Sequence, residues 1–183
     1  MRVITGIARG RKLKALEGLY VRPTAEMVKE AIFSIIQFDI MGSIVLDLFS
    51  GSGQLGIEAI SRGASNCIFV DASRESIKVI EDNVNSVGFT KQSKVLNLDA
   101  LNYLKTCKIT FDIAFLDPPY EKGHIEAVMP LLCEHLSDRG IIVCEHEKKL
   151  VLPENYGKMI KFKTYKYGRV EVTVYKHENY INE

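Results

Sequence analysis

The segment Asp117-Pro118-Pro119-Tyr120 places a carboxylate, a backbone carbonyl and an aromatic ring close together in the chain. It follows the mostly apolar run 111–116, which predicts a buried strand. Because neither proline can donate to a strand ladder, the strand ends there, at the edge where open α/β sheets bind ligands. Asp117 and the Pro118 carbonyl can accept both N–H bonds of a planar amino group while Tyr120 stacks on the ring that carries it. The segment predicts a site for a planar amine, although a strand-ending turn with a surface tyrosine fits it equally well.

A glycine-rich turn lies further upstream, where residues 45–56 pass from an apolar run into a helical pattern. Its glycines have the spacing of a dinucleotide fingerprint, which permits a tight turn and a close backbone approach to a ligand. Asp47 stands just before them, at the end of the strand. A carboxylate there would repel a pyrophosphate and hold an ammonium group. Besides Asp47, the cofactor-binding residues expected in this turn are Phe49, Gly51, Ser52, Gly53 and Gly56.

Two further acids close the next two expected strands. Asp71 is placed to accept both hydroxyls of a ribose, and Asp99 to accept an adenine amino group, with Ala100 supplying a backbone N–H. An ammonium, a ribose and an adenine together describe S-adenosyl-L-methionine. Asp71 would serve a nicotinamide cofactor equally well, and Asp99 by itself is also a plausible helix cap. The amine site at Asp117 favours methyl transfer over hydride transfer.

These residues need a sheet to bring them together, and the pattern after residue 43 supplies one by alternating strands with helices. The expected strands are 44–48, 67–71, 94–98, 111–116 and 140–145. The expected helices are 54–62, 74–87, 100–106 and 123–136. At the tail, 158–167 and 169–176 predict an antiparallel hairpin that closes the sheet. At the start, 2–7 and 12–16 predict another hairpin, followed by a helix that Thr24 caps and that continues to Phe38.

Composition indicates a soluble globular domain, since 46% of the 183 residues are hydrophobic and 26% charged. No apolar run approaches the ~18 residues of a membrane span, and we expect no signal peptide. The four cysteines are scattered, which is typical of reduced thiols in a cytoplasmic protein. The four histidines lack metal-ligand spacing, so we expect no metal site.

The net charge of +1 hides an uneven distribution. Residues 1–30 carry +4 and residues 156–176 carry +5, which leaves −8 for the rest. Basic ends around an acidic middle suggest that the ends hold a polyanion. Arg9, Arg11 and Lys12, at the turn of the first hairpin, are the expected RNA-binding residues, together with the lysines of the tail. Ordinary solvated lysines are the alternative.

The order of these motifs resembles class I amino-methyltransferases, and the N-terminal region narrows the resemblance. Ile4-Thr5-Gly6, Arg9-Gly10-Arg11-Lys12-Leu13, Arg22-Pro23-Thr24 and the helix with 28–33 are similar to the RsmD family. The similarity runs from Arg2 to about Lys176. Tyr120 is a modest departure, because members often carry Phe there.

This resemblance implies a Rossmann-like α/β fold, mostly parallel, with an antiparallel C-terminal hairpin and an N-terminal β-hairpin extension. It implies one domain over 1–183, with 1–20 as the basic extension and 21–183 as the catalytic core. The implied reaction is methyl transfer from S-adenosyl-L-methionine to the exocyclic N2 of a guanine in 16S rRNA of the small ribosomal subunit. The implied catalytic residues are Asp117, Pro118, Pro119 and Tyr120. Arg22 and Thr24 would line the cofactor or base pocket.

Other functions remain open from the sequence. Asp-Pro-Pro-Tyr binds any planar amine, so N6 methylation of adenine in DNA or RNA is the nearest alternative. A nicotinamide oxidoreductase and a non-catalytic RNA-binding module are the others, and the intact acids Asp47, Asp71 and Asp117 argue against the last. We expect a monomer that acts on a partly assembled small subunit, because so small a domain offers little surface for reading a long RNA.

Overall fold

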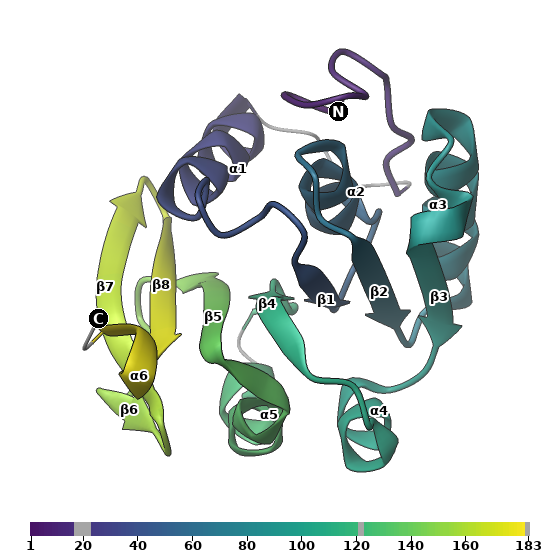
Figure 1. The fold of residues 1–183 in the computed structure, drawn as a ribbon. Coiled ribbons are helices and arrows are strands. Elements are labelled where there is room, and N and C mark those ends of the chain that lie inside the picture. The colour runs from purple at the N-terminus through teal and green to yellow at the C-terminus, as the bar shows by residue number, and fades with distance from the viewer. Residues whose placement is uncertain (17–22, 121–122, 182–183) are drawn as a thin grey trace.

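The computed structural model describes residues 1–16, 23–120 and 123–181. An eight-stranded sheet with the order β3-β2-β1-β4-β5-β8-β7-β6 forms its centre (Figure 1). The five strands from β3 to β5 in that order are parallel, whereas β8, β7 and β6 continue the sheet antiparallel. The strands are β1 Ile44–Leu48, β2 Asn66–Asp71, β3 Ser93–Asn97, β4 Phe111–Leu116, β5 Leu136–Glu147, β6 Asn155–Tyr156, β7 Met159–Tyr167 and β8 Val170–His177.

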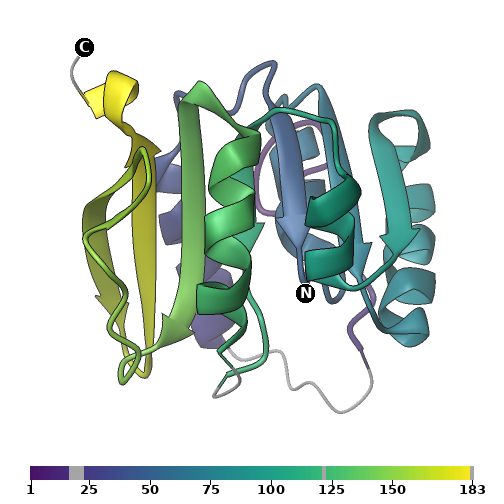
Figure 2. The same ribbon diagram turned by 90° about the horizontal axis from the view of Figure 1, so that it is seen from below.

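Helices cover both faces of the sheet. Helices α1, α2 and α3 lie on one face, and α4 and α5 lie on the other (Figures 1 and 2). The helices are α1 Pro23–Ile35, α2 Gln54–Ser61, α3 Arg74–Val87, α4 Ala100–Thr106, α5 His124–Leu132 and α6 Glu178–Ile181. Short 3-10 turns occupy Thr90–Gln92 and Cys133–His135. None of the helices within residues 23–120 and 123–181 combines the length and the apolarity that crossing a bilayer demands.

The central strands are apolar on both sides because both sides are covered. In β1, Val45 packs into the core under α1–α3, while Leu46 packs into the core over α4 and α5. Phe115 and Leu116 of β4 divide between the same two cores. This alternation sets the direction of each side chain along a strand, because successive residues point to opposite faces.

Most of the expected elements of the parallel sheet are confirmed, several of them with the expected bounds. Strand β4 and helices α3 and α4 begin and end at the expected residues. Helix α3 starts after Ser73, whose side chain accepts the N–H of Ser76, and stops at Gly88, whose φ of 82° allows the chain to leave the helix. The C-terminal hairpin of β7 and β8 is also confirmed.

The junction between α5 and β5 was predicted wrongly. The helix expected to reach residue 136 stops at Leu132, and β5 begins at Leu136 rather than at 140. Leu136 pairs with Phe111 across an irregular register, and the Ser137 hydroxyl donates to Asp112 at 3.0 Å. Contacts with β4 thus hold the polar residues after 136 in a strand that their own sequence does not favour.

The N-terminal segment folds back on itself, but the two strands expected at 2–7 and 12–16 do not form. One antiparallel bridge joins Arg2 to Lys12, with backbone bonds from Val3 to Arg11 and from Leu13 to Met1 beside it. Other residues of the segment bond to α2 and α3. Glu58 accepts the backbone N–H groups of Ile4 and Thr5 at 2.7 and 2.9 Å. Two of the donors that a longer strand ladder would have used are therefore satisfied by a helix side chain.

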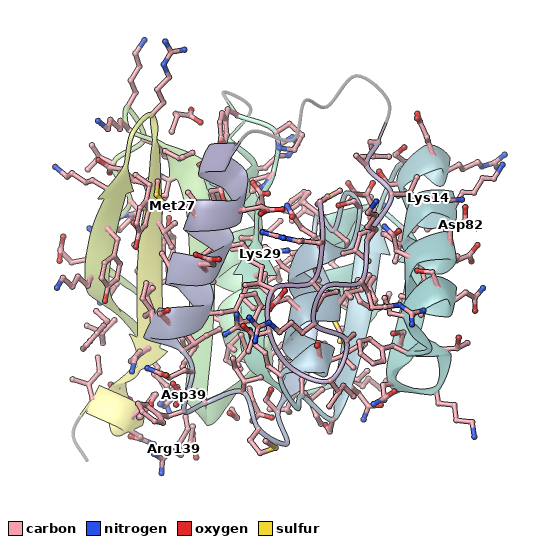
Figure 3. The ribbon with its side chains drawn as sticks, turned by 90° about the horizontal axis from the view of Figure 1, so that it is seen from above. Lys14, Met27, Lys29, Asp39, Asp82 and Arg139 are labelled. Carbon is pink, nitrogen blue, oxygen red and sulfur yellow. The ribbon has the colours of Figure 1, made fainter. Side chains whose placement is uncertain are left out.

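A buried charge cluster fixes this segment to the core. Glu58 is fully buried and receives the Nε of Arg62 at 2.8 Å, with the Nζ of Lys29 at 3.7 Å. Lys29 also donates to the Arg2 carbonyl at 2.8 Å, and Figure 3 shows it reaching from α1 toward the N-terminal segment. Burial lowers the pKa of Lys29, and the Glu58 charge partly opposes that change. The cluster therefore links α1, α2 and the N-terminal segment.

Candidate active site

A cavity of about 700 Å³ opens at the carboxyl ends of the parallel strands. Its walls come from the loops after β1, β2, β4 and the region before α4, which is where open α/β sheets bind ligands. The sequence-predicted residues that line it are Asp47, Phe49, Gly51, Ser52, Asp71, Asp99, Ala100, Asp117, Pro118, Pro119 and Tyr120. The structure thus brings most of the expected cofactor residues and the expected amine site to one cavity.

Two of the predicted glycines lie below the cavity rather than in its wall. Gly53 precedes α2 with a φ of 76°, a conformation that suits glycine. A Cβ at Gly56 would lie 2.3 Å from the Phe69 ring and 2.5 Å from the sulfur of Cys67, so a side chain there would push α2 away from β2. These glycines therefore shape the loop by allowing close packing.

Asp47 is buried beneath the glycine-rich loop. Its Oδ2 accepts the N–H of Gly56 at 2.9 Å, and only 2% of the residue is exposed. Burial raises its pKa to about 7, and the charge of Asp71 adds to the rise, whereas the bond from Gly56 opposes it. Near neutral pH this carboxyl can take up or release a proton, and a nearby cation would favour its ionised form.

Asp71 and Asp99 both line the cavity and also support the backbone. Asp71 accepts the N–H of Gly51 at 2.9 Å and the N–H of Ser73 at 2.8 Å, so it joins the glycine-rich loop to the start of α3. Asp99 lies two residues beyond β3 and caps α4 by accepting the N–H of Asn102 at 3.1 Å. The cap and the cavity wall are therefore compatible roles for Asp99.

Phe49 has an unusual backbone. Its φ of 68° is the only positive value of a non-glycine residue in the described parts of the chain. Its ring packs on the ring of His124 with centroids 5.4 Å apart. Strained residues of this kind concentrate at ligand sites, where the surrounding structure holds them in place. The loop after β1 is thus held against the first turn of α5.

The Asp-Pro-Pro-Tyr segment leaves β4 at the cavity. Asp117 is largely buried, and its pKa is raised by burial, then by the charges of Glu145 and Asp47. Tyr120 is 43% exposed, and its hydroxyl donates to Glu145 Oε1 at 3.2 Å. The side chain of Tyr120 is therefore partly exposed, and its hydroxyl contacts the Glu145 carboxylate.

The sequence interpretation missed several wall residues, which are Leu16, Leu98, His124 and Glu145. Of these, Glu145 had a detectable signal, because it is the last residue of the expected strand 140–145 and thus an acid at a strand end. Burial raises the pKa of Glu145, although the bond from Tyr120 opposes the rise. Leu16 and His124 carried no such signal, since only the fold brings them to the cavity.

The expected RNA-binding residues lie away from the cavity. Ala8, beside Arg9, donates its N–H to Ser61 at the C-terminal end of α2, and Arg11 donates to the carbonyl of Ser86 near the end of α3. The cavity is at the opposite ends of these helices, and the 14 residues of α3 span about 21 Å. Arg9, Arg11 and Lys12 are all exposed. Arg22 and the side chain of Thr24 lie outside the described residues.

No group of three or more His, Cys, Asp or Glu residues within 1–16, 23–120 and 123–181 is arranged to hold a metal ion. Burial raises the pKa of the Cys67 and Cys144 thiols, which keeps them protonated and unreactive.

Comparison with known proteins adds relatives over nearly the full length. The sequence model of a family described as conserved hypothetical protein 95 matches residues 1–176. Putative rRNA methyltransferase YlbH of Bacillus subtilis is 41% identical, over 96% of this chain and 98% of that protein. Ribosomal RNA small subunit methyltransferase D of Haemophilus influenzae is 37% identical, over 90% of this chain and 88% of that protein. The solved structure of putative methyltransferase yhhF from Escherichia coli superposes with a TM-score of 0.87 at 31% identity, covering 97% of each chain.

Proposed function

Since the chain belongs to the RsmD family, described as conserved hypothetical protein 95, we propose that it transfers a methyl group from S-adenosyl-L-methionine to the exocyclic N2 of a guanine in 16S rRNA. The names of its relatives support rRNA methylation, and we propose guanine N2 as the atom that accepts the methyl group. One structural observation supports the proposal most. The buried Asp47 and the Asp117-Pro118-Pro119-Tyr120 segment border the same cavity, so a methyl donor and an acceptor amine can meet there.

The cavity suits this cofactor in size and in chemistry. Its volume of about 700 Å³ falls within the range of small-molecule sites, which is about 300–1,000 Å³. Asp47 would hold the ammonium group, Asp71 the ribose hydroxyls, and Asp99 with the N–H of Ala100 the adenine. When bound, S-adenosyl-L-methionine supplies a methyl group attached to a positively charged sulfonium. After the methyl group is transferred, the rest of the cofactor is a neutral thioether.

The protein orients the amine. The lone pair of an exocyclic amine is delocalised into its ring, which makes it a poor nucleophile. Hydrogen bonds to Asp117 and to the Pro118 carbonyl would draw the nitrogen toward a tetrahedral geometry and direct its lone pair at the methyl carbon. Such orientation can supply ~7–11 kcal/mol in favourable cases.

Asp117 also has a proton to receive. Methyl transfer would form the N–C bond as the C–S bond breaks, with the electron pair left on the sulfur, and one N2 proton would move to the Asp117 carboxylate. Because its raised pKa makes it a stronger base than an ordinary carboxylate, Asp117 suits that role. Tyr120 would stack on the guanine after it leaves its own base stack, which costs a few kcal/mol.

Contacts with RNA would extend beyond the cavity. Arg9, Arg11 and Lys12 are exposed on the N-terminal segment, and Lys158, Lys163, Lys166 and Arg169 are exposed on the C-terminal hairpin. We propose that these groups bind the phosphate backbone without reading sequence. The N-terminal group lies away from the cavity, whereas Lys166 and Arg169 lie at the same edge of the sheet as Glu145, which borders the cavity. The substrate would therefore be an extended RNA surface such as a small-subunit particle, with the protein acting as a monomer.

The test is transfer of labelled methyl groups from S-adenosyl-L-methionine to small ribosomal subunits from a strain that lacks this gene, followed by nucleoside analysis. The expected product is N2-methylguanosine. Label in N6-methyladenosine would keep the mechanism and overturn the guanine assignment. Binding of NADH in place of S-adenosyl-L-methionine would overturn methyl transfer altogether.

A further inference from the structure

Glu145 stands beside Asp117 at the acceptor side of the cavity. Leu116, the last residue of β4, pairs with Cys144 of β5 in parallel register. Asp117 follows directly after β4, and Glu145 is the next residue of β5. Adjacent strands lie about 4.8 Å apart. The charge of Glu145 is also the second-largest cause of the raised pKa of Asp117, which agrees with this placement.

The alternation of side chains puts both carboxylates on one side of the sheet. Phe115 and Val143 belong to the core under α1–α3, and Asp117 and Glu145 each follow one of them by two residues. Residues separated by two positions in a strand point to the same face. Asp47 follows Val45 in the same way, so all three carboxylates face the cofactor cavity from one side.

The surroundings of Glu145 favour a ligand that donates hydrogen bonds. Glu145 borders the main cavity and also a smaller hollow of about 190 Å³, and Tyr120 borders both. None of the ion pairs among the described residues includes Asp117 or Glu145. Two neighbouring carboxylates without a paired cation are costly unless one is protonated or a substrate supplies donors to both.

Guanine has two adjacent donors of this kind on its Watson–Crick edge, N1–H and N2–H₂. We propose that Glu145 accepts the N1–H of the target guanine while Asp117 accepts N2–H, which makes Glu145 the residue that selects guanine over adenine. This inference rests on the proposed function. Adenine has an acceptor at N1, which would face the Glu145 carboxylate and be repelled by it. A site that uses Asp117 and Pro118 alone would accept either amine.

The test uses 2-aminopurine, which keeps the amine at C2 but has no hydrogen on N1. Small-subunit particles are reconstituted with guanine or 2-aminopurine at the methylated position, once that position has been mapped. The wild-type protein is expected to prefer guanine by roughly 10- to 100-fold in kcat/KM, the range for a hydrogen bond to a charged group. A wild-type preference below about 3-fold would overturn the proposal without any variant.

Two variants assign the preference to Glu145. In Glu145→Gln the amide can donate to N1 of 2-aminopurine, so the preference for guanine is expected to fall at least 10-fold. Glu145→Ala offers neither donor nor acceptor and is expected to lower the preference as well. If either variant methylates guanine and keeps the wild-type preference, Glu145 does not read N1–H.

Tyr120→Phe is the matched control. It removes the hydrogen bond to Glu145 and keeps both the ring and the carboxylate. If Glu145 acts only by positioning Tyr120, this variant will lose the guanine preference too, which contradicts the proposal. If the wild-type protein places no label in N2-methylguanosine with natural particles, the proposed function fails. If it methylates guanine and 2-aminopurine equally well, only the proposal for Glu145 fails.

Discussion

The carboxylate of Asp47 accepts the backbone N–H of Gly56 at 2.9 Å inside the protein, where its pKa rises to about 7. The bond links the end of β1 to the first turn of α2. It places a carboxyl that titrates near neutral pH directly under the glycine-rich loop.

Cofactor binding should therefore release protons. Below pH 7 Asp47 is mostly protonated in the free protein, and an ammonium group would favour the ionised form. We expect the affinity for S-adenosyl-L-methionine to fall as the pH drops from 7 to 5. Calorimetry at pH 6 in buffers of different ionisation enthalpy measures the released protons. Equal heats in all buffers would show that Asp47 does not face the ammonium.

Asp47→Asn should stabilise the free protein at pH 8. The pKa of Asp47 is about 7 in the folded protein and about 3.9 in the unfolded chain. The protonated carboxyl therefore favours folding fully below pH 3.9, and this contribution to stability is lost as the pH rises through 7. Asn avoids the cost of a buried charge and can still accept the N–H of Gly56. We expect a gain on the order of 1–3 kcal/mol at pH 8. Urea unfolding at pH 8 and pH 5 checks this, because the gain should shrink at pH 5. An equal effect at both values would contradict the ionisation argument.

Asp117→Ala should separate turnover from cofactor binding. The variant loses the acceptor of the amine proton, and general-base groups contribute about 10²–10⁴-fold to rates. We expect kcat to fall by that amount while the affinity for S-adenosyl-L-methionine changes less than threefold. Label transfer and calorimetry give the two numbers. Turnover near the wild-type rate would remove Asp117 from the mechanism.

Glu58→Gln should destabilise the fold more than Lys29→Met. Removing the charge of Glu58 leaves Lys29 buried without its partner, and breaking such a pair costs about 3–5 kcal/mol. In Lys29→Met, Glu58 keeps Arg62 and the N–H groups of Ile4 and Thr5, so we expect a loss on the order of 1–2 kcal/mol. Urea unfolding followed by circular dichroism measures both. A larger loss of unfolding free energy in Lys29→Met than in Glu58→Gln would show that Lys29 contributes more than Glu58 to holding the N-terminal segment.

Replacing Arg9 and Arg11 together by alanine should weaken RNA binding and reduce its dependence on salt. Each lost phosphate contact lowers the slope of log K against log salt by about 0.7–0.9. Filter binding to small subunits at several salt concentrations measures the slope. The control replaces Lys105 and Lys108, which are also exposed and lie in α4 and just beyond it, on the other side of the sheet. Equal effects of the two pairs would indicate general electrostatics rather than a binding surface at the N-terminal segment.

The sequence predicted those elements whose signals are local. Strand β4 is an apolar run stopped by Pro118, and α3 is bounded by Ser73 and Gly88, so neighbouring residues suffice to define them. Asp47 and Asp117 followed from one rule, acids at the ends of parallel strands. The same rule applied to Glu145, whose significance emerged only when the structure placed it beside Asp117.

The features that sequence missed depend on distant partners. Leu136 joins a strand because Phe111 pairs with it, and the N-terminal pairing stops after Val3 because Glu58 takes the N–H groups of Ile4 and Thr5. The helical pattern around Glu58 gave no indication that its carboxylate points at residues more than fifty positions away. Long-range polar contacts of this kind leave no periodic signal in a single sequence.

The anchoring of Ile4 and Thr5 on Glu58 has a consequence for synthesis. Their hydrogen bonds span 54 and 53 positions, so the beginning of the chain leaves the ribosome well before its partner exists. At about 5–20 residues per second, that interval lasts roughly 3–11 s. The basic N-terminal segment thus cannot close onto α2 until Glu58 has been synthesised. A nascent chain arrested before residue 58 would expose it to degradation or to other RNA.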